Sequence, residues 1–225
     1  MIQSVLRRLR DMQTAELEGG GTAESGFTLI ELMVVLLIIA ILLAIAIPTF
    51  LGVTGSANDR AAQSNLTNGL TEAAAIYQGN NQTFAGITGI LPSSAPEFSW
   101  VSATAVPTAG SNQISVETVD VATYTGGSDG QGVILAAQSK NGSTCWFAVQ
   151  LDATPAVLTV AGDTTGTPFL SSGTAGAAGN QVGATTAGTY YAKTQTQGSC
   201  KATFPQSRGT GFSWGSSYSN APLNP

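Results

Sequence analysis

The chain has 225 residues, of which 43% are hydrophobic and only 9% are charged, and its formal net charge is -5. An acidic chain with so few cations is a poor generic phosphate binder, so broad nucleic-acid binding is disfavoured. Histidine is absent, which removes the commonest general base and the commonest metal ligand. The length suits one or two domains that can bury a real core.

The first 26 residues are mostly polar and carry Arg7, Arg8 and Arg10. Basic residues ahead of an apolar span stay on the cytoplasmic side of a membrane, and acidic residues count for little in this rule. The order of the segments therefore predicts a cytoplasmic N-terminus, with the bulk of the chain outside.

An uncharged apolar span follows this basic segment. From Leu32 to Ile47 every residue is apolar, and twelve of the sixteen are Leu, Ile or Val. As a helix, residues 27–52 would be longer than a bilayer core of about 30 Å at about 1.5 Å per residue. The span therefore predicts a transmembrane helix. Two plainer interpretations of the span are possible. It could be an uncleaved signal anchor, or it could be a secretory signal whose cleavage site is Ala44-Ile45-Ala46.

Pro48 lies near the end of this span. Proline removes a backbone donor and clashes with the preceding turn, so the sequence predicts a kink near this residue. Residues 53–78 then continue as an amphipathic helix, because apolar residues recur at spacings of three and four. That stripe consists of Leu66, Leu70, Ala73, Ala74 and Tyr77. Gly79-Asn80-Asn81 is a stop signal, so we expect one helix from Phe27 to Gln78, bent near Pro48.

Residues 79–225 have the composition of a β-rich globular head. Alternating apolar and β-branched residues predict strands in this part of the chain. The expected strands are Phe98–Val101, Ile114–Tyr124, Val133–Gln138, Cys145–Leu151, Val157–Val160 and Thr189–Thr194. Asn141-Gly142 favours a tight turn, so residues 133–151 are predicted to form an antiparallel hairpin. Residues 161–188 are rich in Gly, Ala and Thr and are expected to be loop.

Cys145 and Cys200 are the only cysteines. In an exported chain they face an oxidising compartment and are expected to pair, which would bound a loop over residues 145–200. Two separate buried thiols are the alternative.

The sequence contains no recognisable catalytic constellation. A Ser-His-Asp set is impossible without histidine, and two cysteines without histidine make a poor zinc site. The aspartates of the head fit no EF-hand spacing; they are Asp120, Asp129, Asp152 and Asp163. We therefore expect no enzyme, no cofactor and no metal site. Four aromatic residues, Tyr190, Tyr191, Trp214 and Tyr218, are expected to pack in the head, with an aromatic binding patch as the alternative.

The segment Gly26-Phe27-Thr28-Leu29-Ile30-Glu31-Leu32 resembles the processing site of type IV prepilins and type II secretion pseudopilins. The resemblance implies that residues 1–26 are a leader peptide. It further implies cleavage between Gly26 and Phe27 by a prepilin peptidase and N-methylation of Phe27. The implied fold is α+β, with a long N-terminal helix packed on an antiparallel β-sheet head.

Glu31 has two interpretations. A carboxylate in apolar surroundings seeks a partner or a proton, and in this family the glutamate is thought to meet the N-terminal amine of a neighbouring subunit. The alternative is an acidic residue that favours the positive end of the helix dipole.

The resemblance implies a structural subunit of a type IV pilus filament. Its partners would be copies of itself, the prepilin peptidase and the pilus assembly machinery. It would reside in the cytoplasmic membrane before assembly and in an extracellular filament afterwards. A minor pilin or a type II secretion pseudopilin is the alternative; major pseudopilins often bind calcium near the C-terminus, whereas the last 60 residues here contain no Asp or Glu. A membrane-anchored adhesin or DNA-uptake module is an alternative of another class.

Overall fold

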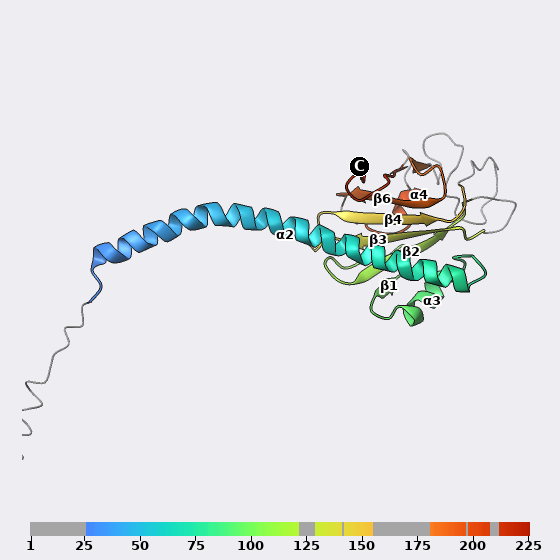
Figure 1. Cartoon of the computed structure of the whole chain (residues 1–225), viewed down its shortest axis with the longest axis horizontal. Helices are drawn as coiled ribbons and strands as arrows, with labels where there is room; N and C mark the ends of the chain where they lie inside the picture. Colours follow the sequence, from blue (N-terminus) through green and yellow to red (C-terminus); the bar gives the residue numbers. More distant parts are fainter. Residues whose placement is uncertain (1–25, 122–128, 141, 155–180, 197, 208–211) are drawn as a thin grey trace, which may run out of the picture. The chain divides into compact units, whose positions relative to one another are not determined.

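The computed structural model describes residues 26–121, 129–140, 142–154, 181–196, 198–207 and 212–225. The chain divides into two compact units, Met1–Phe50 and Leu51–Pro225. The layout is α+β, with a long N-terminal helix and a mostly antiparallel sheet (Figure 1), which confirms the fold class expected from the sequence.

Helix α2 runs from Leu29 to Gly79 and contains 51 residues. The expected helix from Phe27 to Gln78 is therefore correct to within two residues at either end. Pro48 lies inside α2, where its nitrogen has no hydrogen to donate to the preceding turn. The hydroxyl of the next residue, Thr49, donates to the carbonyl of Ala46 at 2.9 Å. The kink at Pro48 stays a prediction.

The part of α2 within the second unit is amphipathic. Its buried residues fall on one stripe; they are Ala62, Leu66, Gly69, Leu70, Ala73 and Tyr77. This confirms the expected stripe except at Ala74, which is only half-buried. Because these positions are three or four residues apart, they share one face of the helix. That face packs into a hydrophobic cluster with residues of the sheet and of helix α3 (Ile87–Ser94).

The main sheet of the head has six strands in the order β1-β2-β3-β4-β6-β8. Its strands are β1 (Ser99–Val101), β2 (Gln113–Val119), β3 (Gly132–Gln138), β4 (Cys145–Leu151), β6 (Gly188–Thr194) and β8 (Leu223–Asn224). A second, two-stranded sheet pairs β5 (Gln181–Val182) with β7 (Phe212–Ser213). A short helix, α4 (Phe204–Ser207), precedes β7. The predicted hairpin over residues 133–151 is present, because β3 and β4 pair antiparallel from Gly132–Leu151 to Gln138–Cys145.

Several details differ from the sequence-based expectation. Both edges of the main sheet are parallel, because β1 runs parallel to β2 and β8 runs parallel to β6. The strand expected over Ile114–Tyr124 ends at Val119. The expected loop over 161–188 contains the short strand β5. This strand pairs in parallel with β7, which comes later in the chain. The strand expected over Val157–Val160 and most of that loop lie outside the described residues.

The sheet buries side chains on both of its faces. Val133 and Leu135 of β3 join the cluster that contains the α2 stripe, whereas Ile134 and Ala136 join the second cluster. This split follows from the period of two in a strand, which sends successive side chains to opposite faces. The second cluster also contains the C-terminal residues Ala202, Phe204, Phe212 and Trp214. These four C-terminal residues therefore cover the sheet face opposite α2.

Candidate processing and assembly site

Gly26 and Phe27 lie just before helix α2, which begins at Leu29. Phe27 is 82% exposed, and a Cβ placed on Gly26 would meet no heavy atom within 4 Å. The peptide bond between them is thus outside regular structure and uncovered within the described part of the chain. The bond is therefore accessible to a protease.

The first turn of α2 is closed by a reciprocal capping box between Thr28 and Glu31. The Thr28 backbone N–H and its hydroxyl both donate to Oε2 of Glu31, at 2.9 Å and 2.7 Å. The Glu31 backbone N–H in turn donates to the Thr28 hydroxyl at 3.3 Å. This arrangement satisfies two backbone donors that a helix start would otherwise leave unpaired.

The capping box gives Glu31 a structural role within its own chain. The sequence signal for it was present, since threonine precedes glutamate by three residues ahead of an apolar run. The helix dipole, the alternative to subunit pairing that the sequence suggests, does not identify Thr28 as the partner of Glu31. Both hydrogen bonds from Thr28 end on Oε2.

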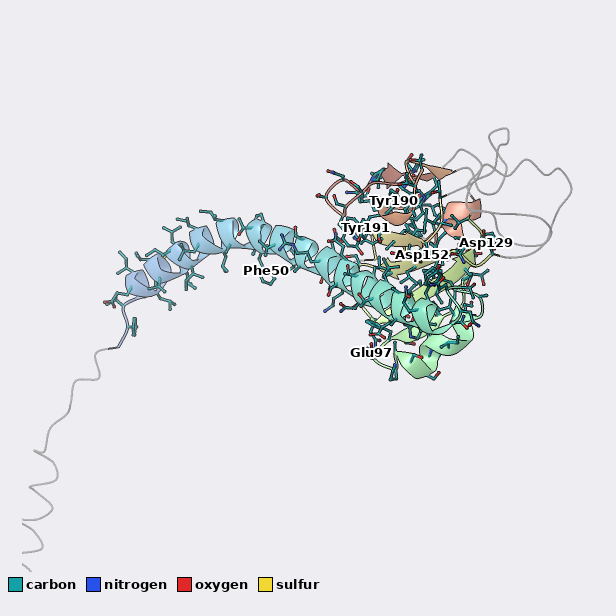
Figure 2. The ribbon with its side chains drawn as sticks, turned by 45° about the vertical axis from the view of Figure 1, so that its right-hand side comes forward. Phe50, Glu97, Asp129, Asp152, Tyr190 and Tyr191 are labelled. Atoms are coloured by element: carbon teal, nitrogen blue, oxygen red, sulfur yellow. A yellow bond between two sulfur atoms is a disulfide. The ribbon has the colours of Figure 1, made fainter. Side chains whose placement is uncertain are left out.

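The apolar half of α2 is the largest uncovered hydrophobic surface in the described structure. Every large apolar side chain from Phe27 to Val53 is between 45% and 82% exposed. Phe50, for example, projects from the helix and is 68% exposed (Figure 2). The helix is long and apolar enough to cross a membrane, and none of its most apolar 18-residue window is buried. A core helix of a soluble domain would have this window covered.

Cys145 and Cys200 form a disulfide with a Cα–Cα distance of 5.2 Å. Both cysteines are buried, in the cluster on the sheet face opposite α2. The bond attaches the C-terminal segment to the first residue of β4. Its role is to fasten that segment to the sheet.

The aromatic residues considered as a single binding patch lie in two different clusters. Tyr191 and Tyr218 pack beside the α2 cluster, whereas Tyr190 and Trp214 belong to the opposite face. Tyr218 contacts Tyr191 with ring centroids 4.1 Å apart. Its hydroxyl donates to the backbone carbonyl of Gln63 in α2 at 3.1 Å. Packing, rather than one shared patch, describes these residues.

Two of the aspartates considered for calcium accept hydrogen bonds from the backbone, and Asp152 accepts one from the side chain of Gln150. Asp120 accepts a hydrogen bond from the Gly130 N–H at 3.2 Å, and Asp129 accepts one from the Gln131 N–H at 2.9 Å. Asp163 lies outside the described residues. Within the described ranges, no group of three or more acidic or cysteine side chains is placed to hold a metal ion.

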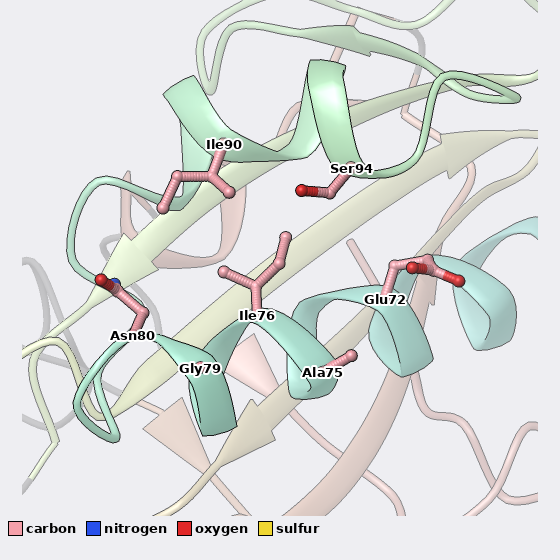
Figure 3. Close-up of a pocket in the computed structure, with 7 residues that line it drawn as sticks. All are labelled: Glu72, Ala75, Ile76, Gly79, Asn80, Ile90 and Ser94. Atoms are coloured by element: carbon pink, nitrogen blue, oxygen red, sulfur yellow. The ribbon is translucent and has the colours of Figure 1, made fainter.

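A surface groove of about 400 Å³ lies between the end of α2 and α3 (Figure 3). Ile76 of α2 and Ile90 of α3 line it, together with Glu72, Ala75, Gly79, Asn80 and Ser94. Figure 3 shows Ile76 directed across the groove towards α3. The side-chain amide of Asn80 donates to the carbonyls of Thr83 and Ala85, both at 2.9 Å, so it closes the adjoining turn. Glu72 is the single charged residue of the lining, and we assign the groove no function.

The long apolar helix and the mostly antiparallel sheet form a pilin-like α+β layout, and the helix is long and apolar enough to cross a membrane. Residues 22–47 match the family model described as the prokaryotic N-terminal methylation motif. The chain therefore carries the signature of prepilin-type proteins, the type IV pilins and pseudopilins. No curated protein and no solved structure matches the chain.

Proposed function

We propose that this chain is a structural subunit of a type IV pilus filament. A prepilin peptidase cleaves it between Gly26 and Phe27, the new amine of Phe27 is methylated, and the pilus assembly machinery moves the mature chain from the membrane into the filament. The proposal is carried by the methylation motif at residues 22–47 lying directly on an apolar helix that the described structure leaves uncovered.

The physical argument concerns what covers the apolar half of α2. In the membrane, lipid solvates its exposed Leu, Ile and Val side chains. Outside the membrane, the same side chains need an apolar environment of similar extent, because burial is worth roughly 25 cal/mol per Å² of apolar surface. A second copy of the same helix supplies such a surface, and a bundle of copies supplies it on every side. The apolar helix would thus form the filament core, with the head domains outside.

Glu31 is proposed to set the offset between neighbouring copies. Cleavage creates an α-amine at Phe27, four residues before Glu31. A charged carboxylate in a helix bundle is costly unless it meets an opposite charge. Pairing Glu31 of one copy with the Phe27 amine of a neighbour would neutralise both groups at a single register.

Two substitutions at Glu31 separate subunit pairing from helix capping. Glu31→Ala removes the charge and the cap, whereas Glu31→Gln removes the charge and keeps a side chain that completes a capping box. We expect both variants to insert in the membrane and to be cleaved normally, and both to lose most sheared filament. Cleavage is followed by the mass of the membrane-bound chain, and filament yield by immunoblotting of the sheared fraction. Normal filament yield from Glu31→Gln would show that capping, and not charge pairing, is what assembly needs.

Abundance distinguishes a major subunit from a minor pilin or a secretion pseudopilin. If the chain is the major subunit, long surface filaments should consist mainly of this chain, and its deletion should abolish them. Filaments that persist without it, built from another chain, would reassign it to a minor or accessory role.

A further inference from the structure

Glu117 is a half-buried acidic residue of the head. It lies in the middle of β2 and pairs across the sheet with Ile134. Ile134 and the nearby Val119 belong to the cluster opposite α2, so the period of two along the strand places Glu117 on that buried face. Its Oε2 atom is buried and has no hydrogen-bond partner in the described part of the chain.

A segment of the C-terminal region, here called the strap (residues 199–205), is attached to the same face close to Glu117. The backbone N–H of Ala202 donates to the hydroxyl of Ser115 at 3.0 Å, and Ser115 is two residues before Glu117 on β2. The Thr203 N–H donates to the carbonyl of Ala103 at 3.1 Å. Cys200 fixes the strap to β4 through the disulfide. The strap and Glu117 thus occupy neighbouring positions on one buried surface.

Few ionisable groups face this surface from the elements packed on it. Among the described residues, Tyr190 on β6 packs on this face. Asp120 after β2 and Lys201 on the strap each stand in the sequence between two residues that belong to it. Asp120 already accepts the Gly130 N–H. Burial raises the pKa of Glu117 to about 7, because an unpaired carboxylate is poorly solvated there.

We propose that the head domain takes up a proton when it folds, burying Glu117 as the neutral carboxylic acid, so that mild acid tightens the strap on the sheet and alkaline conditions loosen it. In the unfolded chain the carboxyl group has its ordinary pKa of 4.5, and it is therefore ionised at neutral pH. The folded state holds the proton more tightly, so this contribution to stability is complete below pH 4.5 and is lost as the pH rises through about 7.

The test uses the full-length chain in detergent micelles and follows thermal unfolding of the head by tryptophan fluorescence. We expect the Tm of the unmodified protein to fall by roughly 3 to 6 °C between about pH 5.5 and about pH 8.5. Glu117→Gln, which is neutral and of the same shape, should keep the higher Tm and lose this dependence. Glu97→Gln is the matched control, since Glu97 is exposed, and it should behave like the unmodified protein.

Amide hydrogen exchange of the strap gives a second, local readout. After correction for the intrinsic pH dependence of exchange, protection of residues 199–205 should fall at alkaline pH in the unmodified protein and stay constant in Glu117→Gln. The proposal is overturned if Glu117→Gln keeps the full pH dependence of Tm. It is also overturned if Glu117→Gln is less stable than the unmodified protein at every pH, because the ionised carboxylate would then be the form that the fold uses.

Discussion

Gly69 allows α2 to lie close to the sheet. A Cβ at this position would stand 3.0 Å from Cδ1 of Ile114, 3.1 Å from Cδ1 of Leu135 and 3.3 Å from the Trp100 ring. Gly69→Ala would raise helix propensity by up to about 1 kcal/mol, but it forces three core side chains to move, which typically costs about 1–3 kcal/mol. We expect a net loss of unfolding free energy of about 1 kcal/mol, measured by denaturant unfolding of the head.

Gly55 provides the matched control on the same helix. A Cβ there meets no heavy atom within 4 Å, so Gly55→Ala changes helix propensity without overpacking. Its effect should therefore be neutral or stabilising. Equal effects of the two substitutions would contradict the close approach of α2 to the sheet at Gly69.

Residue by residue, the candidate site was predictable where the signal is local. Gly26, Phe27 and Glu31 stand at fixed spacing ahead of an apolar run, so sequence alone predicts them as the candidate site. The hydrogen bonds between Thr28 and Glu31 are equally local, because the spacing of the two residues is that of a capping box. The partial burial of Glu117 is not predictable from local sequence, because the face of β2 that carries it also binds the strap, as the Ala202 N–H bond to Ser115 shows across 87 positions.

At the scale of elements, the disulfide is the strongest single constraint on the strap. It joins residues 55 positions apart, and closing a loop of that size stabilises the fold by about 4 kcal/mol in the chain-entropy model. Replacing both cysteines, Cys145→Ala together with Cys200→Ala, should lower the free energy of unfolding by about that amount. Denaturant unfolding measures it.

Reduction of the disulfide in the unmodified protein is the control for that double variant. Reduction breaks the same bond but disturbs the packing of the two side chains less than the two alanine substitutions do. Both treatments should lower the denaturation midpoint similarly. A midpoint that moves in neither case would show that the strap is held by its other contacts.

The elements that sequence predicted well are those with a long local pattern. β4 begins and ends where expected, because Cys145, Phe147, Val149 and Leu151 alternate onto one face. The apolar stripe of α2 was likewise readable from its spacing. By contrast, α3 contains Gly89 and Pro92, which weaken any local helix signal. The strands β5, β7 and β8 are two residues long and exist only through partners distant in sequence.

At the scale of the whole molecule, the chain is made of two units with opposite solvent requirements. The head buries apolar side chains on both faces of its sheet, which suits an aqueous compartment. The apolar half of α2 leaves its own side chains uncovered, which suits lipid or a bundle of like helices. Under the proposed function, removal of the charged leader would allow this helix to pass from lipid into a bundle of like helices.

The most direct test of this account is the intact mass and N-terminal sequence of the chain recovered from sheared surface filaments. We expect a mature chain that begins at N-methylated Phe27 and makes up most of the protein in the sheared filaments. A chain beginning near Ile47 would indicate cleavage after Ala46 as an ordinary secretory signal. Correctly cleaved chains found only as monomers in the membrane of cells with a working assembly apparatus would contradict polymerisation through the apolar helix.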